Sequence, residues 1–109
     1  MPARDLIKNR GWLRYGNSYP DSSIAPWPLG KLQVDSGAIQ LALPWRKFVF
    51  PRKSIIRLMR TAGPFGLTSV TGFQIEHTLL EQPNTMIFWT HHFPEIKALL
   101  EKNGYSLGG

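Results

Sequence analysis

The sequence predicts a mainly β domain: a strongly bent antiparallel sheet, or partly open barrel, of about seven short strands capped by one C-terminal α-helix. Short segments in which apolar and polar residues alternate, each bounded by Gly, Pro, Asn or Asp, predict the strands. The hydrophobic period changes to that of a helix only near the end of the chain. A length of 109 residues suits one domain and is short for two.

The beginning of the chain predicts an irregular arm. Residues 1–26 contain Gly and Pro at close intervals, mixed with aromatic residues. Such frequent breakers disfavour a long helix or strand. We therefore predict an irregular aromatic arm over residues 1–26, followed by a single domain over residues 27–109.

A hairpin opens the predicted domain. Leu32 and Val34 alternate with polar neighbours, Asp35-Ser36-Gly37 supplies turn chemistry, and the segment Ile39–Leu43 alternates again. Pro44 then ends the second strand of this hairpin, because proline cannot donate to a strand ladder. A tight connection at residues 45–47 leads to the next strand.

Two further strands follow this connection. Phe48–Phe50 is a short strand stopped by Pro51. Ser54–Arg60 is extended again, since the β-branched residues Ile55 and Ile56 favour strands. Residues 61–69 contain two Gly and one Pro and predict a loop.

The last two strands differ in their patterns. In residues 71–79, one face carries Phe73, Ile75, His77 and Leu79, and the other face is polar. After a turn at residues 81–84, the segment 85–91 is apolar on both faces at its centre, which predicts that both faces are covered.

A helix over about residues 94–103 closes the chain. Pro94 suits a first helical position, Glu95 complements the positive end of the helix, and Gly104 suits a left-handed cap. The apolar stripe of this helix is expected to lie against the sheet and contains Ile96, Leu99 and Leu100.

Positive charge is concentrated in the first part of the chain. Residues 1–60 contain eleven Lys or Arg and three Asp, whereas residues 61–109 contain two Lys and four Glu. Such asymmetry attracts phosphates, anionic lipid headgroups or acidic proteins, although it also serves solubility alone. Within Pro44–Arg60 no carboxylate interrupts the candidate anion-binding residues, which are Arg46, Lys47, Arg52, Lys53, Arg57 and Arg60.

The composition indicates in which cellular compartment the protein is expected. The chain has no cysteine, so a disulfide framework or a thiolate zinc site is ruled out and nothing requires an oxidising environment. No apolar run approaches the roughly 18 residues that a spanning helix needs. We expect a cytoplasmic protein, at most peripheral to the inner face of a membrane.

The motifs of catalysis do not occur in this sequence. His91 and His92 are adjacent, so in an extended segment they project to opposite sides, and His77 lies on an apolar strand face. There is no nucleophile elbow, phosphate loop or dinucleotide fingerprint. We therefore expect no catalytic residue, no metal, no cofactor and no small-molecule substrate.

Four stretches carry a resemblance to a known superfold: Phe48–Leu58, Gly72–His77, Ile87–Thr90 and the helix that runs to Asn103-Gly104-Tyr105. Over about residues 27–105 the chain resembles the pleckstrin-homology-like (PH-like) superfold, in particular small bacterial PH-like and GRAM-type domains. The resemblance implies a non-enzymatic binding module. Eukaryotic relatives often hold phosphoinositide headgroups with basic residues in the loop between their first two strands. Here that loop is taken as Asp35-Ser36-Gly37, which has no Lys or Arg, so no binding residue is carried over.

Three kinds of partner are weighed for such a module. The first is another protein or a second copy of the chain, contacted by a sheet edge and by the aromatic residues Trp12, Tyr15, Tyr19, Trp27 and Trp45. The alternative is an anionic membrane surface, bound by the six cations between residues 46 and 60. Nucleic acid is the least favoured, because Phe48 and Phe50 are expected to point into the core rather than stack on bases.

Overall fold

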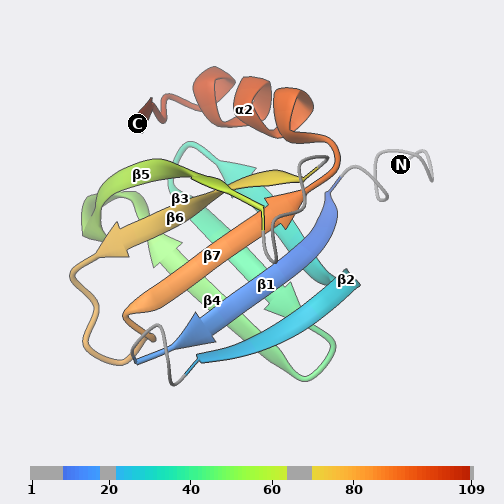
Figure 1. The fold of residues 1–109 in the computed structure, drawn as a ribbon. Coiled ribbons are helices and arrows are strands. Elements are labelled where there is room, and N and C mark those ends of the chain that lie inside the picture. Colours follow the sequence, from blue (N-terminus) through green and yellow to red (C-terminus); the bar gives the residue numbers. More distant parts are fainter. Residues whose placement is uncertain (1–8, 18–21, 64–69, 109) are drawn as a thin grey trace.

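The computed structural model describes residues 9–17, 22–63 and 70–108. Its strands form one eight-stranded sheet in the spatial order β4-β3-β2-β1-β7-β6-β5-β8. The sheet curls strongly into a half-barrel, and helix α2 lies across one end of it (Figure 1). The strands are β1 (Arg10–Gly16), β2 (Ser22–Asp35), β3 (Ala38–Leu43), β4 (Arg46–Pro51), β5 (Ile55–Ala62), β6 (Thr71–His77), β7 (Thr85–Thr90) and β8 (Leu107–Gly108). The 3₁₀-helix η1 (Arg52–Ser54) joins β4 to β5, and α2 is Phe93–Lys102.

The predicted fold class is confirmed. The described residues form a mainly β structure with a strongly bent sheet and a helix near the C-terminal end. The strands that were predicted after residue 30 all form, within a few residues of the expected bounds. Neighbouring strands are antiparallel, apart from β8, which pairs parallel with β5.

The predicted irregular arm is wrong for the part of residues 1–26 that the structure describes. Arg10–Gly16 is strand β1, which pairs with β2 on one side and β7 on the other. Leu13 in the middle of β1 is fully buried in the core. The predicted boundary at residue 27 therefore falls inside β2, while residues 1–8 and 18–21 lie outside the described residues.

The breakers of this region have a different role from the one that the sequence suggested. A Cβ atom on Gly11 would lie 2.0 Å from the carbonyl oxygen of Trp89, so glycine permits the close approach of β1 to β7. Pro26 and Pro28 lie in a bulge of β2: Ala25 pairs with Leu13 and Gly30 with Gly11, which leaves residues 26–29 without a partner on β1. Proline is tolerated there because no ladder hydrogen bond is lost.

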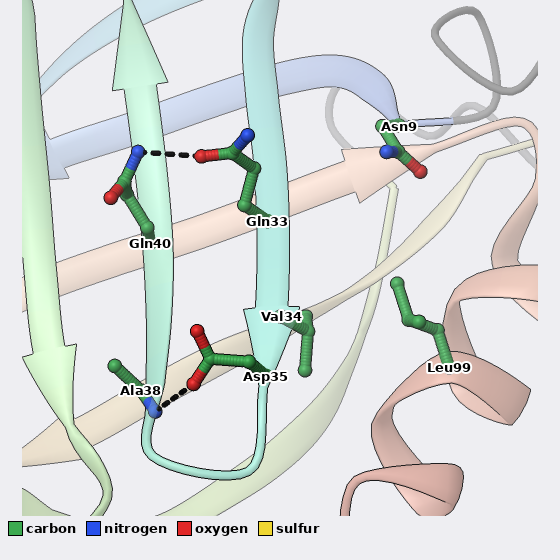
Figure 2. A pocket seen from close by; sticks show the side chains of 7 residues that line it. All are labelled: Asn9, Gln33, Val34, Asp35, Ala38, Gln40 and Leu99. Atoms are coloured by element: carbon green, nitrogen blue, oxygen red, sulfur yellow. Dashed lines mark hydrogen bonds between the residues drawn. The ribbon is translucent and has the colours of Figure 1, made fainter. Parts of the chain in front are cut away.

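The predicted hairpin with its turn at Asp35-Ser36-Gly37 is confirmed and joins β2 to β3. The carboxylate oxygen Oδ1 of Asp35 accepts hydrogen bonds from the backbone N–H group of Gly37 at 2.8 Å and from that of Ala38 at 2.9 Å, the latter drawn in Figure 2. The sequence suggested that this turn is the loop between the first two strands. That prediction is wrong, because β1 precedes the hairpin. That loop joins β1 to β2, and residues 18–21 of it lie outside the described part of the chain.

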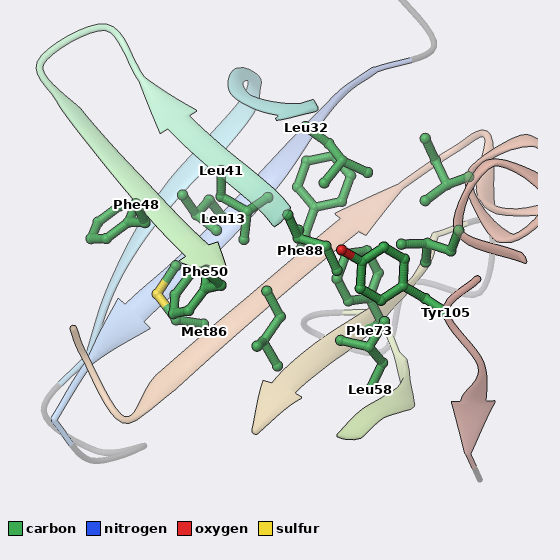
Figure 3. Close-up of a cluster of buried hydrophobic side chains, with 14 of the residues drawn as sticks. Leu13, Leu32, Leu41, Phe48, Phe50, Leu58, Phe73, Met86, Phe88 and Tyr105 are labelled. Atoms are coloured by element: carbon green, nitrogen blue, oxygen red, sulfur yellow. The ribbon is translucent and has the colours of Figure 1, made fainter. Parts of the chain in front are cut away.

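One hydrophobic core fills the concave side of the sheet. Side chains from seven strands and from Tyr105 converge there (Figure 3), among them Leu13, Leu32, Leu41, Phe48, Phe50, Leu58, Phe73, Met86 and Phe88. Each fully buried side chain of this size contributes about 2 kcal/mol relative to its exposed state. The core therefore accounts for the alternating pattern of the strands.

Strand β7 is covered on both faces, as predicted. All six of its residues are buried. Met86 and Phe88 belong to the main core, whereas Ile87 and Trp89 form a second small cluster with Val70, against which Trp12 packs. β7 thus lies beside β1 in the middle of the sheet, and both of its faces are packed.

Helix α2 agrees with its prediction to within one residue at each end. Ile96 and Leu100 are buried in the main core, while Leu99 is half-buried. Gly104 has φ 89° and so adopts the left-handed conformation expected of a helix cap. Beyond it, Tyr105 enters the core and the chain continues into β8, a strand that was not predicted.

Candidate functional site

The six cations between residues 46 and 60 do not form one patch. Arg46 and Lys47 begin β4, Arg52 and Lys53 lie in η1, and the other two lie on β5. Since a strand rises about 3.3 Å per residue, the two ends of β4 are roughly 17 Å apart. The stretch therefore supplies charge to separate regions of the surface.

Arg52 serves the structure of the helix end. Its guanidinium donates hydrogen bonds to the carbonyl oxygens of Asn103 at 2.9 Å and Gly104 at 2.6 Å, and a longer one to Ser36 at 3.4 Å. The same guanidinium lies 4.8 Å from the ring centroid of Tyr105. Arg52 thereby holds η1, the β2–β3 turn and the end of α2 together.

Three more of the six cations have partners within the chain. Arg57 pairs across strands with Glu76 at 2.6 Å, and both side chains remain largely exposed. Arg46 lies over the rings of Tyr15 and Phe48, and Arg60 over that of Phe93. Within the described residues, Lys47 and Lys53 are the two members of the set whose side chains make no hydrogen bond, ion pair or ring contact. The anion-binding prediction thus stays a hypothesis, and fewer of the six cations are without a partner than the sequence suggested.

Of the five aromatic candidates for a partner contact, two pack against the domain, two are exposed, and one lies outside the described residues. Trp12 packs on the small cluster and contacts the ring of His91 at 5.0 Å, and Tyr15 contacts Phe48 at 5.3 Å, so both serve the folded domain. Trp27 and Trp45 are 43% and 62% exposed and so remain candidates for a contact. Tyr19 lies outside the described residues.

A pocket of about 460 Å³ lies between α2 and the β2–β3 hairpin (Figure 2). Leu99 and Val34 form its apolar side, and the amides of Asn9, Gln33 and Gln40 its polar side. The amide nitrogen of Gln40 donates to the amide oxygen of Gln33 at 2.8 Å, so these two side chains partly satisfy each other. Asp35 is the charged residue that lines the pocket, and its carboxylate is engaged in the turn. Among the described residues, this pocket offers neutral hydrogen-bonding groups and no cation for an anion.

A second candidate lies where the end of the chain passes along β5. Two hollows of about 320 Å³ and 170 Å³ flank β8 here. We name them, with the edge of β5 between them, the β5 groove. The larger hollow is lined by β5 residues from Ile55 to Leu58, by Arg52 and by residues 104–106; the smaller is lined by Arg60, Phe93, Lys97, Leu107 and Gly108.

Most of the outer edge of β5 is not used by β8. Within the described part of the chain, Leu58 and Met59 alone have register partners there, namely Leu107 and Gly108. Ile56 and Met59 of β5 are exposed by 58% and 36%. A strand edge with unpaired backbone groups and apolar side chains is suited to binding another extended segment.

The sequence did not indicate this groove. The sequence pattern predicts neither a role for Lys97 nor a structure for the residues after Gly104. The one signal available was the alternation of Tyr105 and Leu107 with small or polar residues, which is too short to predict a strand.

No group of three or more His, Cys, Asp or Glu side chains that could hold a metal ion occurs in residues 9–17, 22–63 and 70–108. No helix in those same ranges is long and apolar enough to cross a membrane. Comparisons of the chain with protein-family models, with curated proteins and with solved structures find no match.

Proposed function

We propose that the chain is a non-enzymatic PH-like binding module that contacts another protein through an edge of its curled sheet. The observation that carries this proposal is the parallel pairing of Leu107–Gly108 with β5. Here an extended segment has been added to the sheet edge, which is the geometry by which many adaptor domains take up peptides. The bent sheet with a helix across its end also fits the PH-like resemblance.

The alternative of anionic lipid headgroups receives less support. Arg52 is engaged by carbonyl groups and Arg57 by a carboxylate, and the six cations expected to bind them lie in separate regions of the surface. Nucleic acid receives less still, because Phe48 and Phe50 are fully buried and offer no surface on which bases could stack.

The test uses the full-length protein as bait for a displayed library of random extended peptides. We expect a recurrent peptide motif whose synthetic version binds in fluorescence polarisation. Light scattering of the protein alone identifies the case in which a second copy is the partner, because the particle mass then doubles. If no motif recurs, the protein stays monomeric, and it sediments with phosphatidylserine vesicles in a salt-sensitive manner, the proposal is overturned in favour of lipid binding.

A further inference from the structure

We propose that the β5 groove docks an acidic extended segment of a partner protein, which displaces β8 and runs parallel to β5. This inference rests on the proposed function and adds the place, the direction and the chemistry of the partner. Its basis is the geometry of β8 together with the charges that surround the end of that strand.

The position of β8 gives the direction of the incoming segment. Leu107 and Gly108 pair with Leu58 and Met59, so β8 uses two of the eight residues of β5. Leu107 is only half-buried and Gly108 is exposed. A short strand with so few contacts is readily displaced by a longer one that pairs along more of the same edge.

The charged side chains that line the β5 groove determine which kind of segment it favours. At the smaller hollow, Arg60 and Lys97 come from β5 and α2 and flank the end of β8. Arg60 rests on the ring of Phe93, which fixes its position without neutralising it, and Lys97 has no ion pair among the described residues. Carboxylates of an extended segment that follow the position of Gly108 would therefore meet two positive charges.

Acidic groups near the groove do not cancel this charge. Glu76 is engaged by Arg57, and Glu101, one helical turn after Lys97, lines neither hollow. Leu58 and Phe93 provide buried apolar surface where Leu107 now lies. The favoured segment thus has an apolar residue at the Leu107 position, a small one at the Gly108 position, and acidic residues next.

The experiment compares two fluorescein-labelled peptides whose last two residues carry opposite charges. One is Tyr-Ser-Leu-Gly-Glu-Glu, which repeats residues 105–108 of the chain and adds two acids; its control is Tyr-Ser-Leu-Gly-Lys-Lys. Binding is measured by fluorescence polarisation to the full-length protein and to the Leu107→Ser variant, in which the chain's own β8 is loosened. We expect the acidic peptide to bind at least tenfold more tightly than the basic one, and several-fold more tightly to Leu107→Ser than to the unaltered protein.

Charge reversal in the groove supplies the decisive control. In the Leu107→Ser background, Arg60→Glu with Lys97→Glu should reverse the preference, so that the basic peptide binds more tightly. Circular dichroism verifies folding, and the milder pair Arg60→Gln with Lys97→Gln, which should abolish the preference, replaces the reversal if that variant does not fold. Equal binding of the two peptides, no binding of either, or an unchanged preference after reversal overturns the proposal.

Two further outcomes separate this inference from the proposed function. If peptides selected from the library bind the charge-reversed protein as tightly as the unaltered one, the proposed function stands and the β5 groove is not its site. If charge reversal abolishes sedimentation with phosphatidylserine vesicles and leaves peptide binding unchanged, Arg60 and Lys97 serve a lipid surface and the inference is overturned.

Discussion

Tyr105 connects the end of the helix to a distant turn. Its ring is buried in the main core, and its hydroxyl donates a hydrogen bond to the backbone carbonyl oxygen of Asp35 at 3.0 Å. Burial raises the pKa of Tyr105 above its ordinary value of 10.0; Arg52 opposes that shift and Asp35 adds to it. The folded protein therefore favours the neutral phenol, which alone can donate this bond.

A dependence of stability on alkaline pH follows from this shift. A raised pKa in the folded state means that the stabilisation is fully present below pH 10.0 and is lost as the pH rises through the folded-state pKa. The Tyr105→Phe variant lacks this titration. It should be less stable than the unaltered protein at pH 8 by about 1 kcal/mol, and the difference should shrink above pH 10. Urea unfolding of both proteins across this range measures it; a difference that is constant with pH would contradict the prediction.

At the scale of elements, η1 does more than connect β4 to β5. It presents Arg52 to the carbonyl groups of Asn103 and Gly104, the two residues that follow α2. A cation at this position also complements the negative end of the helix dipole. The Arg52 side chain therefore joins η1, the β2–β3 turn and the end of α2, in addition to the hydrogen bond from Tyr105 to Asp35.

Replacing that side chain tests the junction. Arg52→Ala should lower the free energy of unfolding by about 1–3 kcal/mol, because hydrogen bonds from a charged donor to backbone carbonyl groups are lost. The neighbouring Lys53→Ala is the matched control and should stay within about 0.5 kcal/mol of the unaltered protein. Thermal and urea unfolding provide the measurement. Equal effects of the two substitutions would mean that the contacts of Arg52 do not stabilise the fold.

For the whole molecule, pairing and burial predict a gradient of local stability. β7 lies between β1 and β6 with every residue buried, whereas β8 pairs at two positions on the edge of the sheet. Native-state hydrogen exchange should therefore be slowest in β7 and much faster in β8. Exchange in β8 as slow as in β7 would show that the end of the chain is held as firmly as the core.

The sequence could predict those parts of this molecule that depend on local pattern. The alternation around Leu32, Ile39 and Phe48 and the helical stripe of Ile96 and Leu100 are local, and the structure confirms them. β1 was missed because the role of Gly11 depends on the backbone of Trp89, a contact that no local pattern indicates. The cations were grouped by their proximity in sequence, yet folding assigns Arg52 to the helix end and Arg60 to a hollow shared with Lys97.

The place of β7 between β1 and β6 also bears on how the molecule is made. Trp12 pairs with Trp89 and Gly16 with Thr85, so the second strand to flank β1 leaves the ribosome only after β2 to β6 have been synthesised. Until then β2, β3 and β4 can pair with one another, because they are consecutive in the sequence. One edge of β1, however, still has unpaired backbone groups. Pairings so distant along the chain slow folding. We therefore expect a chaperone to matter most while the nascent chain is incomplete and this edge of β1 is unpaired.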